Sequence, residues 1–512
     1  MFIIYLRVAS SKFLLFRLVW STLSKGELYM AKTCIVCGGP AGSGEHVFPA
    51  SLGGRRTNRG IYCLTHDNGY SYLVSELAGQ LDVFNSLLGV RPDHSRDIKS
   101  VRGRYSDGRD IELSAKASKF AGPRVFSQEP RGEGALFQMA FPDLASMNRW
   151  RAEQEALGRT VTVEKTGEPS TYFVGPVHFS RAFGGRDGLA AVAYVSQTFL
   201  AQEFPELARS QGVKDFIRFT QIAAKARKKS TSENMQIEGM GAAASADAPI
   251  WWDFEPKPDV APNHFSFGHR VTVGVDADDG LIYGRLSFFS SVHFSMVFGV
   301  APDARESKAV TIDIDPLAEH PPKDIARTER FDALMRVERP RSQTAGLAQA
   351  IASDDASRLF DDLMMRMSAH SLAKTASEMS DELAEASCLS QGQIERRIAD
   401  IVEARSQRIL NLMLFFVRDF KKSAQGRRFQ KIWPIIDTLV ELDPMSTNGL
   451  SRQATAFFHL AKQAILSTML DDYKNGRLNE RRFAELMGEG PGLAIVGKAI
   501  LQPVLGALPT GE

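Results

Sequence analysis

The chain has 512 residues, of which 44% are hydrophobic and 24% charged, and its formal net charge is +2. This length exceeds one ordinary core and predicts roughly two to four domains. The composition excludes a chain that is disordered throughout, and the near-neutral charge excludes overall basicity, so any polyanion site must be a local patch. Four cysteines are too few for a disulfide scaffold and are typical of a metal or redox site in a reducing compartment, which predicts a cytoplasmic protein.

Residues 1–29 are apolar, but Arg7, Lys12 and Arg17 divide the apolar run. No uninterrupted stretch approaches the roughly 20 residues that a membrane span needs, so we expect no integral membrane association. We interpret 1–29 as a mis-assigned start before the true start at Met30, or as a disordered leader. The alternative is an amphipathic anchor that lies on a membrane surface.

Three of the four cysteines fall in one short segment. Cys34-x2-Cys37 and Cys63-x2-His66 are separated by 25 residues. Two such turns can bring four ligands to a tetrahedral Zn²⁺. The spacing therefore predicts a structural zinc site of these four residues. The alternative is a reduced thiol pair beside an unrelated Cys and His.

Between the two half-sites lies the run EHVFPASLGGRR, which starts at Glu45 and His46. A neutral imidazole is suited to removing a proton from water near neutral pH. Here the sequence resembles the HNH endonuclease family, in particular the branch with a zinc knuckle around a Glu-His-hydrophobic-x-Pro and Gly-Gly motif. The resemblance covers about residues 31–90. It implies a ββα-metal fold, in which two short strands, a loop and a helix hold one divalent ion.

The resemblance implies a role for each matching residue. His46 stands at the position of the general base, and Glu45 at the acidic position associated with the catalytic metal or its second shell. Asn58 matches the middle Asn, which steadies the loop or orients the base. Either Asp67 or Asn68 holds the place of the last metal ligand, and oxygen ligands there suit a catalytic Mg²⁺ or Mn²⁺.

These residues predict a metal-dependent endonuclease that hydrolyses nucleic-acid phosphodiester bonds, with DNA favoured. His46 would activate water, while an ion held near Glu45 would stabilise charge on the scissile phosphate. The flanking backbone would be held by three arginines, Arg55, Arg56 and Arg59. Backbone contacts carry no sequence information, so little specificity is expected from this segment. Nucleases of this kind often act against foreign DNA, which suggests a role in prokaryotic defence.

Two departures from the family pattern leave an alternative open. His66 stands where a cysteine is usual, and Asp67 where Asn is common. The alternative is a catalytically inactive, zinc-dependent protein that binds nucleic acid or serves as an assembly scaffold. Its protein partner, or a second copy of the chain, would bind through the helical carboxy-terminal region.

The remainder of the chain predicts an α+β fold class. Apolar residues at helical spacing over 73–88 predict a helix that covers the knuckle, and those over 189–199 predict another. Alternating apolar residues at 271–275 and 292–298 predict antiparallel strands. A proline-free, Ala- and Leu-rich stretch after Pro340 predicts several long helices.

We therefore expect three domains after the leader. They are an HNH ββα-metal domain with its covering helix over 30–125, a mixed α+β domain with an antiparallel sheet over 126–320, and a mostly helical domain over 321–512.

Overall fold

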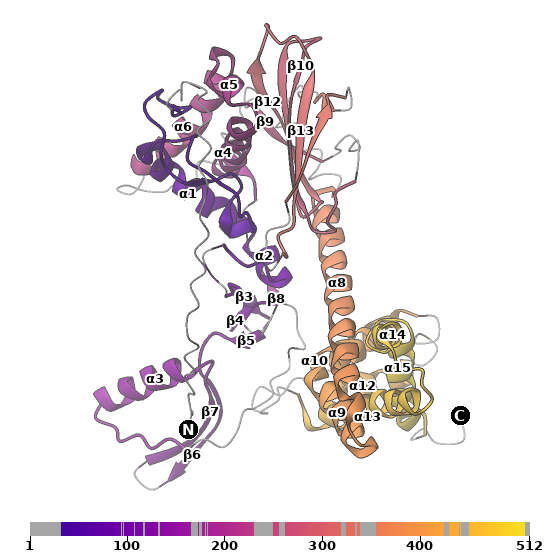
Figure 1. The fold of residues 1–512 in the computed structure, drawn as a ribbon. Coiled ribbons are helices and arrows are strands. Elements are labelled where there is room, and N and C mark those ends of the chain that lie inside the picture. The colour runs from indigo at the N-terminus through magenta and orange to yellow at the C-terminus, as the bar shows by residue number, and fades with distance from the viewer. Residues whose placement is uncertain are drawn as a thin grey trace, which may run out of the picture.

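The computed structural model describes residues 32–506 apart from internal gaps. The gaps are 94, 96, 107, 116–117, 132–133, 165–172, 174–176, 180, 182, 230–248, 255–261, 319–323, 333–334, 338–354, 424–426, 428–429, 440 and 442–449. The sequence predictions for 1–29 lie outside the described residues. The protein has a mixed α+β fold, with helices and a sheet above and a helical region below (Figure 1). No helix among the described residues is long and apolar enough to cross a membrane.

The amino-terminal segment is a short hairpin followed by two helices. Glu45 lies opposite Asn58 in the antiparallel pair, and the helices begin directly after Cys63. The predicted apolar face is confirmed, because its residues are buried, although the helix is interrupted at Leu81. The elements are β1 (Glu45–His46), the 3-10 turn η1 (Ala50–Leu52), β2 (Thr57–Asn58), α1 (Leu64–Gln80) and α2 (Asp82–Leu88).

A six-stranded sheet is the largest β structure of the described residues. Its order is β14-β13-β10-β11-β12-β9, with every neighbouring pair antiparallel. The strands predicted at 271–275 and 292–298 are confirmed as parts of β10 and β12. The strands are β9 (Ile250–Asp253), β10 (His269–Asp276), β11 (Leu281–Phe288), β12 (Val292–Val300), β13 (Lys308–Ile314) and β14 (Asp324–Arg330).

Helices cover one face of this sheet. α4 lies between the sheet and α1, and its apolar residues over 189–199 are buried as predicted (Figure 1). One continuous hydrophobic core contains Ile35 and Tyr62 from the knuckle segment together with Val271 and Ile312 from the sheet. The borders at 125 and 320 stay a prediction, but the knuckle and the sheet share their buried surface. The helices are α4 (Gly185–Glu203), α5 (Pro205–Arg209), η2 (Gln211–Val213) and α6 (Lys214–Lys229).

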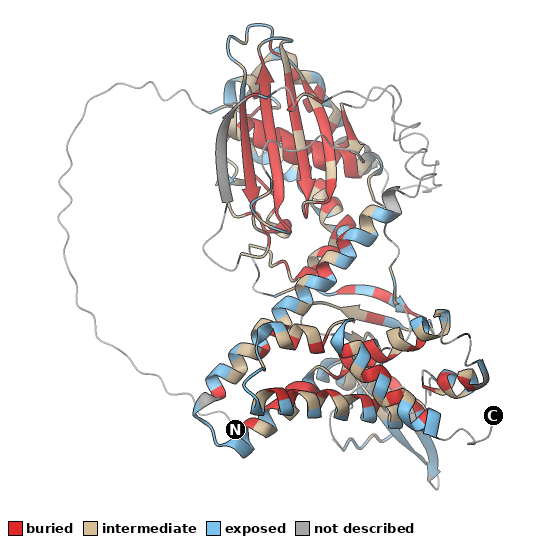
Figure 2. Ribbon diagram, turned by 90° about the vertical axis from the view of Figure 1, so that its right-hand side faces the viewer, coloured by how far each residue is buried: buried red, intermediate tan, exposed pale blue. Residues whose placement is uncertain are grey.

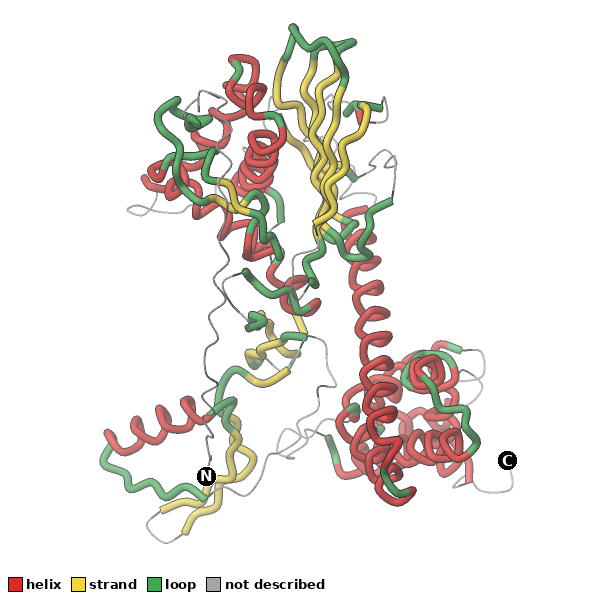
Figure 3. The backbone as a smooth tube through the Cα atoms, viewed as in Figure 1, coloured by secondary structure: helices red, strands yellow, loops and turns green. Residues whose placement is uncertain are grey.

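Two smaller sheets lie below α2. A four-stranded sheet has the order β5-β4-β3-β8, and β6 and β7 form a separate hairpin. With α3, this hairpin makes an arm that projects away from the rest of the molecule (Figure 3). α3 buries none of its residues. The elements are β3 (Val101–Tyr105), β4 (Asp110–Leu113), β5 (Ser118–Phe120), β6 (Arg124–Arg131), β7 (Gly134–Ala140), α3 (Leu144–Ala156) and β8 (Val177–His178).

The carboxy-terminal region is mostly helical, as predicted. The long helix α8 joins the two halves, because Leu363 packs in the core of the sheet while Met379 packs in a second, helical core (Figure 2). The elements are α8 (Asp355–Glu385), η5 (Ala386–Cys388), α9 (Gln391–Ala404), α10 (Ser406–Lys422), η6 (Gln430–Ile432), α12 (Trp433–Thr438), α13 (Arg452–Lys474), α14 (Glu480–Leu486) and α15 (Pro491–Gly506).

Candidate metal and catalytic site

The structure brings Cys34, Cys37, Cys63 and His66 together, with their ligand atoms all within 4.8 Å of one another. The distance from His66 Nδ1 is 3.1 Å to Cys63 Sγ and 3.7 Å to Cys34 Sγ, and the sulfurs of Cys37 and Cys63 are 3.9 Å apart. A tetrahedral Zn²⁺ with ordinary bond lengths separates its ligands by roughly 3.5 to 3.8 Å. The four residues therefore fit a metal such as zinc, and His66 can fill the fourth position.

Local backbone geometry places these ligands. The first pair lies in a tight turn, in which Gly38 donates to the carbonyl of Cys34 and adopts a φ of 73°. The second pair lies at the start of α1, where Cys63 is the N-cap and His66 donates its backbone N–H to the carbonyl of Cys63. Each half-site is thus fixed by a few consecutive residues, and only the pairing of the halves requires the tertiary fold.

The two ends of the cluster differ in their surroundings. Burial raises the pKa of the Cys34 thiol. At Cys63 burial acts in the same direction, but hydrogen bonds from the backbone N–H of His66 and from the side chains of Cys34 and Cys37 outweigh it and lower the pKa. A bound cation would favour the thiolate at both positions, since the metal ligand is the deprotonated form.

A second cluster is built from carboxyl groups. The Glu45 side chain of β1 hydrogen-bonds with that of Asp67 in α1, and Ser43 donates its hydroxyl to Asp67. Burial, followed by the neighbouring Asp67, raises the pKa of Glu45 to about 8. Two partly buried carboxyl groups in contact resist carrying negative charge together, so one of them is protonated more readily than an isolated carboxyl.

The structure distinguishes the two residues that the sequence left as alternatives. Asp67 is partly buried and faces Glu45, whereas Asn68 is exposed and its backbone carbonyl accepts a hydrogen bond from Ser71. Successive helical residues point in directions about 100° apart, so only one of them can face β1. The carboxyl pair therefore consists of Glu45 and Asp67.

A network of buried polar side chains, most of them from α4, lies next to Glu45. Tyr194 of α4 hydrogen-bonds with Glu45, and its pKa is raised by burial. Close by, the hydroxyl of Tyr62 is 2.9 Å from that of Thr198 and accepts from Gln197 at 3.0 Å. Tyr194 lies 149 positions after Glu45, and no spacing or motif in the sequence signals this contact.

His46 faces a partner outside the motif. Its Nε2 lies 3.1 Å from Oδ2 of Asp93, and only 15% of the His46 side chain is exposed. Arg55 places Nη1 3.0 Å from Oδ1 of the same carboxylate. Sequence analysis missed Asp93, because it stands in a turn-rich basic run that gave no catalytic signal.

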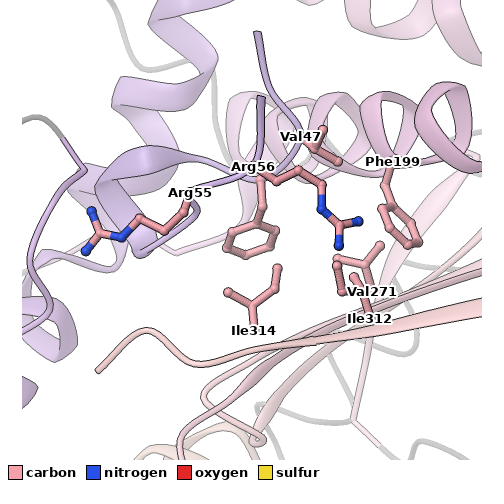
Figure 4. Close-up of a pocket in the computed structure, with 8 residues that line it drawn as sticks. Val47, Arg55, Arg56, Phe199, Val271, Ile312 and Ile314 are labelled. Atoms are coloured by element: carbon pink, nitrogen blue, oxygen red, sulfur yellow. The ribbon is translucent and has the colours of Figure 1, made fainter. Parts of the chain in front are cut away.

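The three predicted phosphate-binding arginines lie in different environments. Arg55 and Arg56 extend in opposite directions from the loop (Figure 4). The Arg55 side chain is 7% exposed and donates to Asp93 and to the carbonyl of Arg91. Arg56 lies 3.5 Å from Glu203 of α4, beside a small pocket. Arg59 is exposed and lies next to Gly44.

Asn58 steadies the turn that follows β2. Its Oδ1 accepts from the backbone N–H of Gly60 at 2.6 Å, and its Nδ2 donates to Gln202 of α4 at 2.6 Å. The role of Asn58 in the site stays a prediction. Both side-chain groups of Asn58 are used in contacts with residues other than His46.

The Gly-Gly pair lets the loop after His46 lie against the sheet. Gly53 has a φ of 88°, and a Cβ there would come within 2.7 Å of Pro316 Cα. At Gly54 a Cβ would approach the carbonyl oxygen of Phe48 to 2.0 Å. Phe48 also stacks on His269 of β10, with ring centroids 5.1 Å apart. The sheet thus supports the segment that carries His46.

Comparison with known proteins gives no family to which the chain can be assigned. No protein-family model, no curated protein and no solved structure matches it. The resemblance to HNH endonucleases therefore rests on the motif residues themselves.

Proposed function

We propose that the chain is a metal-dependent HNH-type endonuclease that hydrolyses nucleic-acid phosphodiester bonds, with DNA favoured. The observation that carries this proposal is the pairing of Glu45 with Asp67, at the residue that precedes His46 in β1. The order of hairpin, helix and zinc-compatible cluster supports a ββα-metal arrangement for residues 32–80. A purely structural knuckle has no need of two partly buried carboxyl groups in contact with each other.

The proposed chemistry assigns one task to each group. Glu45 and Asp67 would hold the divalent ion, which when bound supplies positive charge to stabilise the scissile phosphate and the leaving oxygen. His46 accepts a proton from the attacking water as its oxygen bonds to phosphorus. The bond from phosphorus to the 3′ oxygen breaks, and that oxygen takes a proton from solvent. Arg59 is exposed and suited to contact a flanking phosphate.

The direct test is a cleavage assay with plasmid, single-stranded DNA and RNA. The wild-type protein is expected to cut at least one of them in Mg²⁺ or Mn²⁺ and to be inactive without divalent ions. His46→Ala should lose activity by at least about 100-fold, the scale of general acid-base catalysis. Glu45→Gln, which removes a proposed ligand of the divalent ion, should also lose activity. His459→Ala, which changes an exposed histidine of α13, should keep full activity.

The outcomes separate the nuclease from its alternative. Equal cleavage by folded His46→Ala would defeat the assignment of the base. Binding of nucleic acid without cleavage by the wild-type protein would instead favour the inactive zinc-dependent binding protein. Zinc content should be measured on each variant, so that loss of the structural cluster is not mistaken for loss of catalysis.

A further inference from the structure

Asp93 contacts two side chains of the segment 45–56, here called the motif loop. One carboxylate oxygen lies 3.1 Å from His46 Nε2 and the other lies 3.0 Å from Arg55 Nη1. The side chains of His46 and Arg55 are 15% and 7% exposed, and that of Asp93 is 26% exposed, so the set is partly shielded from water. Asp93 lies outside the segment that matches the family motif. It reaches His46 because the chain returns to the motif loop after α2.

The position of Asp93 is fixed from both sides. α2 ends at Leu88, and Gly89 follows with a left-handed φ of 79°, which turns the chain back toward the motif loop. The backbone N–H of Asp93 then donates to the carbonyl of Ala50 at 3.3 Å. The Nη2 of Arg55 donates to the carbonyl of Arg91 at 3.0 Å. The carboxylate is therefore held against the loop by side-chain and backbone contacts together.

The chemistry of this contact determines where the imidazole carries its proton. Burial by itself would raise the pKa of Asp93, but hydrogen bonds from His46 and Arg55 outweigh it and lower the pKa. An ionised carboxylate only accepts hydrogen bonds. The nitrogen that faces it must therefore donate, which places the proton of neutral His46 on Nε2 and leaves Nδ1 as the basic nitrogen.

We propose that Asp93 is a positioning residue that fixes His46 in the tautomer with the proton on Nε2, so that Nδ1 is the atom that takes the proton from water. Arg55 acts indirectly, because it holds the carboxylate of Asp93 in place. This inference rests on the proposed function for the role of His46 in catalysis. The tautomer itself is a property of this chain and can be tested without activity.

The first test measures the tautomer by NMR. Protein labelled with ¹⁵N-histidine is observed at about pH 8, where an ordinary imidazole is neutral, and the His46 signals are those missing from His46→Gln. The expected spectrum shows a protonated Nε2 and a bare Nδ1, with both tautomers populated in Asp93→Asn. A wild-type spectrum with the proton on Nδ1 would overturn the proposal, whether or not the protein cleaves nucleic acid.

The second test separates chemistry from binding. Asp93→Asn should lower kcat by on the order of 10²- to 10⁴-fold, the range found when a group that orients a catalytic imidazole or metal ligand is altered. KM for DNA should stay unchanged, and Asp93→Glu should recover part of kcat. Asp97→Asn, a change at an exposed residue four positions on, is the matched control and should behave as wild type.

The results distinguish the two proposals. An unchanged kcat in folded Asp93→Asn would remove Asp93 from the mechanism and leave the nuclease standing. Absence of cleavage by the wild-type protein would overturn the proposed function, while the NMR spectrum would still decide the tautomer. If Asp93→Asn fails to fold, the proposal is decided by the tautomer in the wild-type spectrum and by kcat of Asp93→Glu.

Discussion

The zinc-compatible cluster and the carboxyl pair lie within the same 35 residues, but they are built differently. All four ligands of the first come from two short turns, Cys34–Cys37 and Cys63–His66. The second depends on distant parts of the chain. Tyr194 of α4 supports Glu45, and Asp93 faces His46. The proposed functions explain this difference: a structural metal site can be local because a bound ion holds its ligands together, whereas the side chains of a catalytic site must be held by their surroundings.

The largest effect is expected from breaking the local cluster. Cys34→Ser or Cys63→Ser should lose the bound zinc and destabilise the protein, with a cost of up to about 10 kcal/mol, the scale of structural zinc in small domains. Metal analysis and thermal unfolding would measure both losses. Cys388→Ser changes an exposed cysteine outside the cluster and should leave zinc and stability intact. Normal stability after loss of the metal would contradict a structural role.

The next effect tests how far the sheet supports the motif loop. Burial lowers the pKa of His269 from 6.5 to about 3. The pKa of His269 is lower in the folded protein than in the unfolded chain. The stability that depends on neutral His269 is therefore fully present above pH 6.5 and is lost as the pH falls through about 3. The full loss is about 5 kcal/mol, since a difference of one between the two pKa values is worth about 1.4 kcal/mol.

The measurement is urea unfolding between pH 7 and pH 4. His269→Phe, which keeps a ring against Phe48, should show a weaker fall in stability with acid than wild type. His459→Gln, at an exposed histidine, should keep the wild-type pH dependence. An equal fall in His269→Phe would show that other groups cause the acid sensitivity.

A smaller effect is expected from cation binding at the carboxyl pair. Mn²⁺ at 100 times its dissociation constant should stabilise the zinc-loaded protein by about 2.7 kcal/mol, seen as a rise in Tm. Asp67→Ala should abolish the rise, and Asn68→Ala, at the exposed neighbour, should keep it. The reverse pattern would assign the ligand to Asn68 and contradict the observed pairing of Glu45 with Asp67.

The smallest effect distinguishes the arginines of the loop. Arg59→Ala should weaken DNA binding for all sequences alike and reduce the salt dependence of binding by about one contact. Arg55→Ala should instead lower Tm, because it leaves Asp93 without its ion-pair partner. Binding by fluorescence anisotropy at several salt concentrations would check both. An unchanged salt dependence in Arg59→Ala would exclude a phosphate contact at that position.

Much of the fold was accessible from periodicity. The alternation of Val271, Val273 and Val275 predicted a strand, and β10 contains it, although every residue of β10 is buried and not only the alternating valines. The order of strands was not accessible. β13 lies beside β10 and not beside β12, a pairing between residues far apart in sequence that no local pattern encodes.

By itself the sequence identified the four residues that could hold a metal, and the adjacent pair Glu45 and His46. Short spacings fix the four residues of the cluster, because a tight turn or the first turn of a helix presents its side chains in nearly the same way in any fold. Only the tertiary structure placed Asp67 against Glu45 in preference to Asn68, and brought Tyr194 and Asp93 to the site. The sequence predicted Arg55 as a phosphate ligand, whereas in the tertiary structure Arg55 forms an ion pair with Asp93. Such contacts arise where separate elements share one core, and the residues that make them carry no spacing that would reveal them.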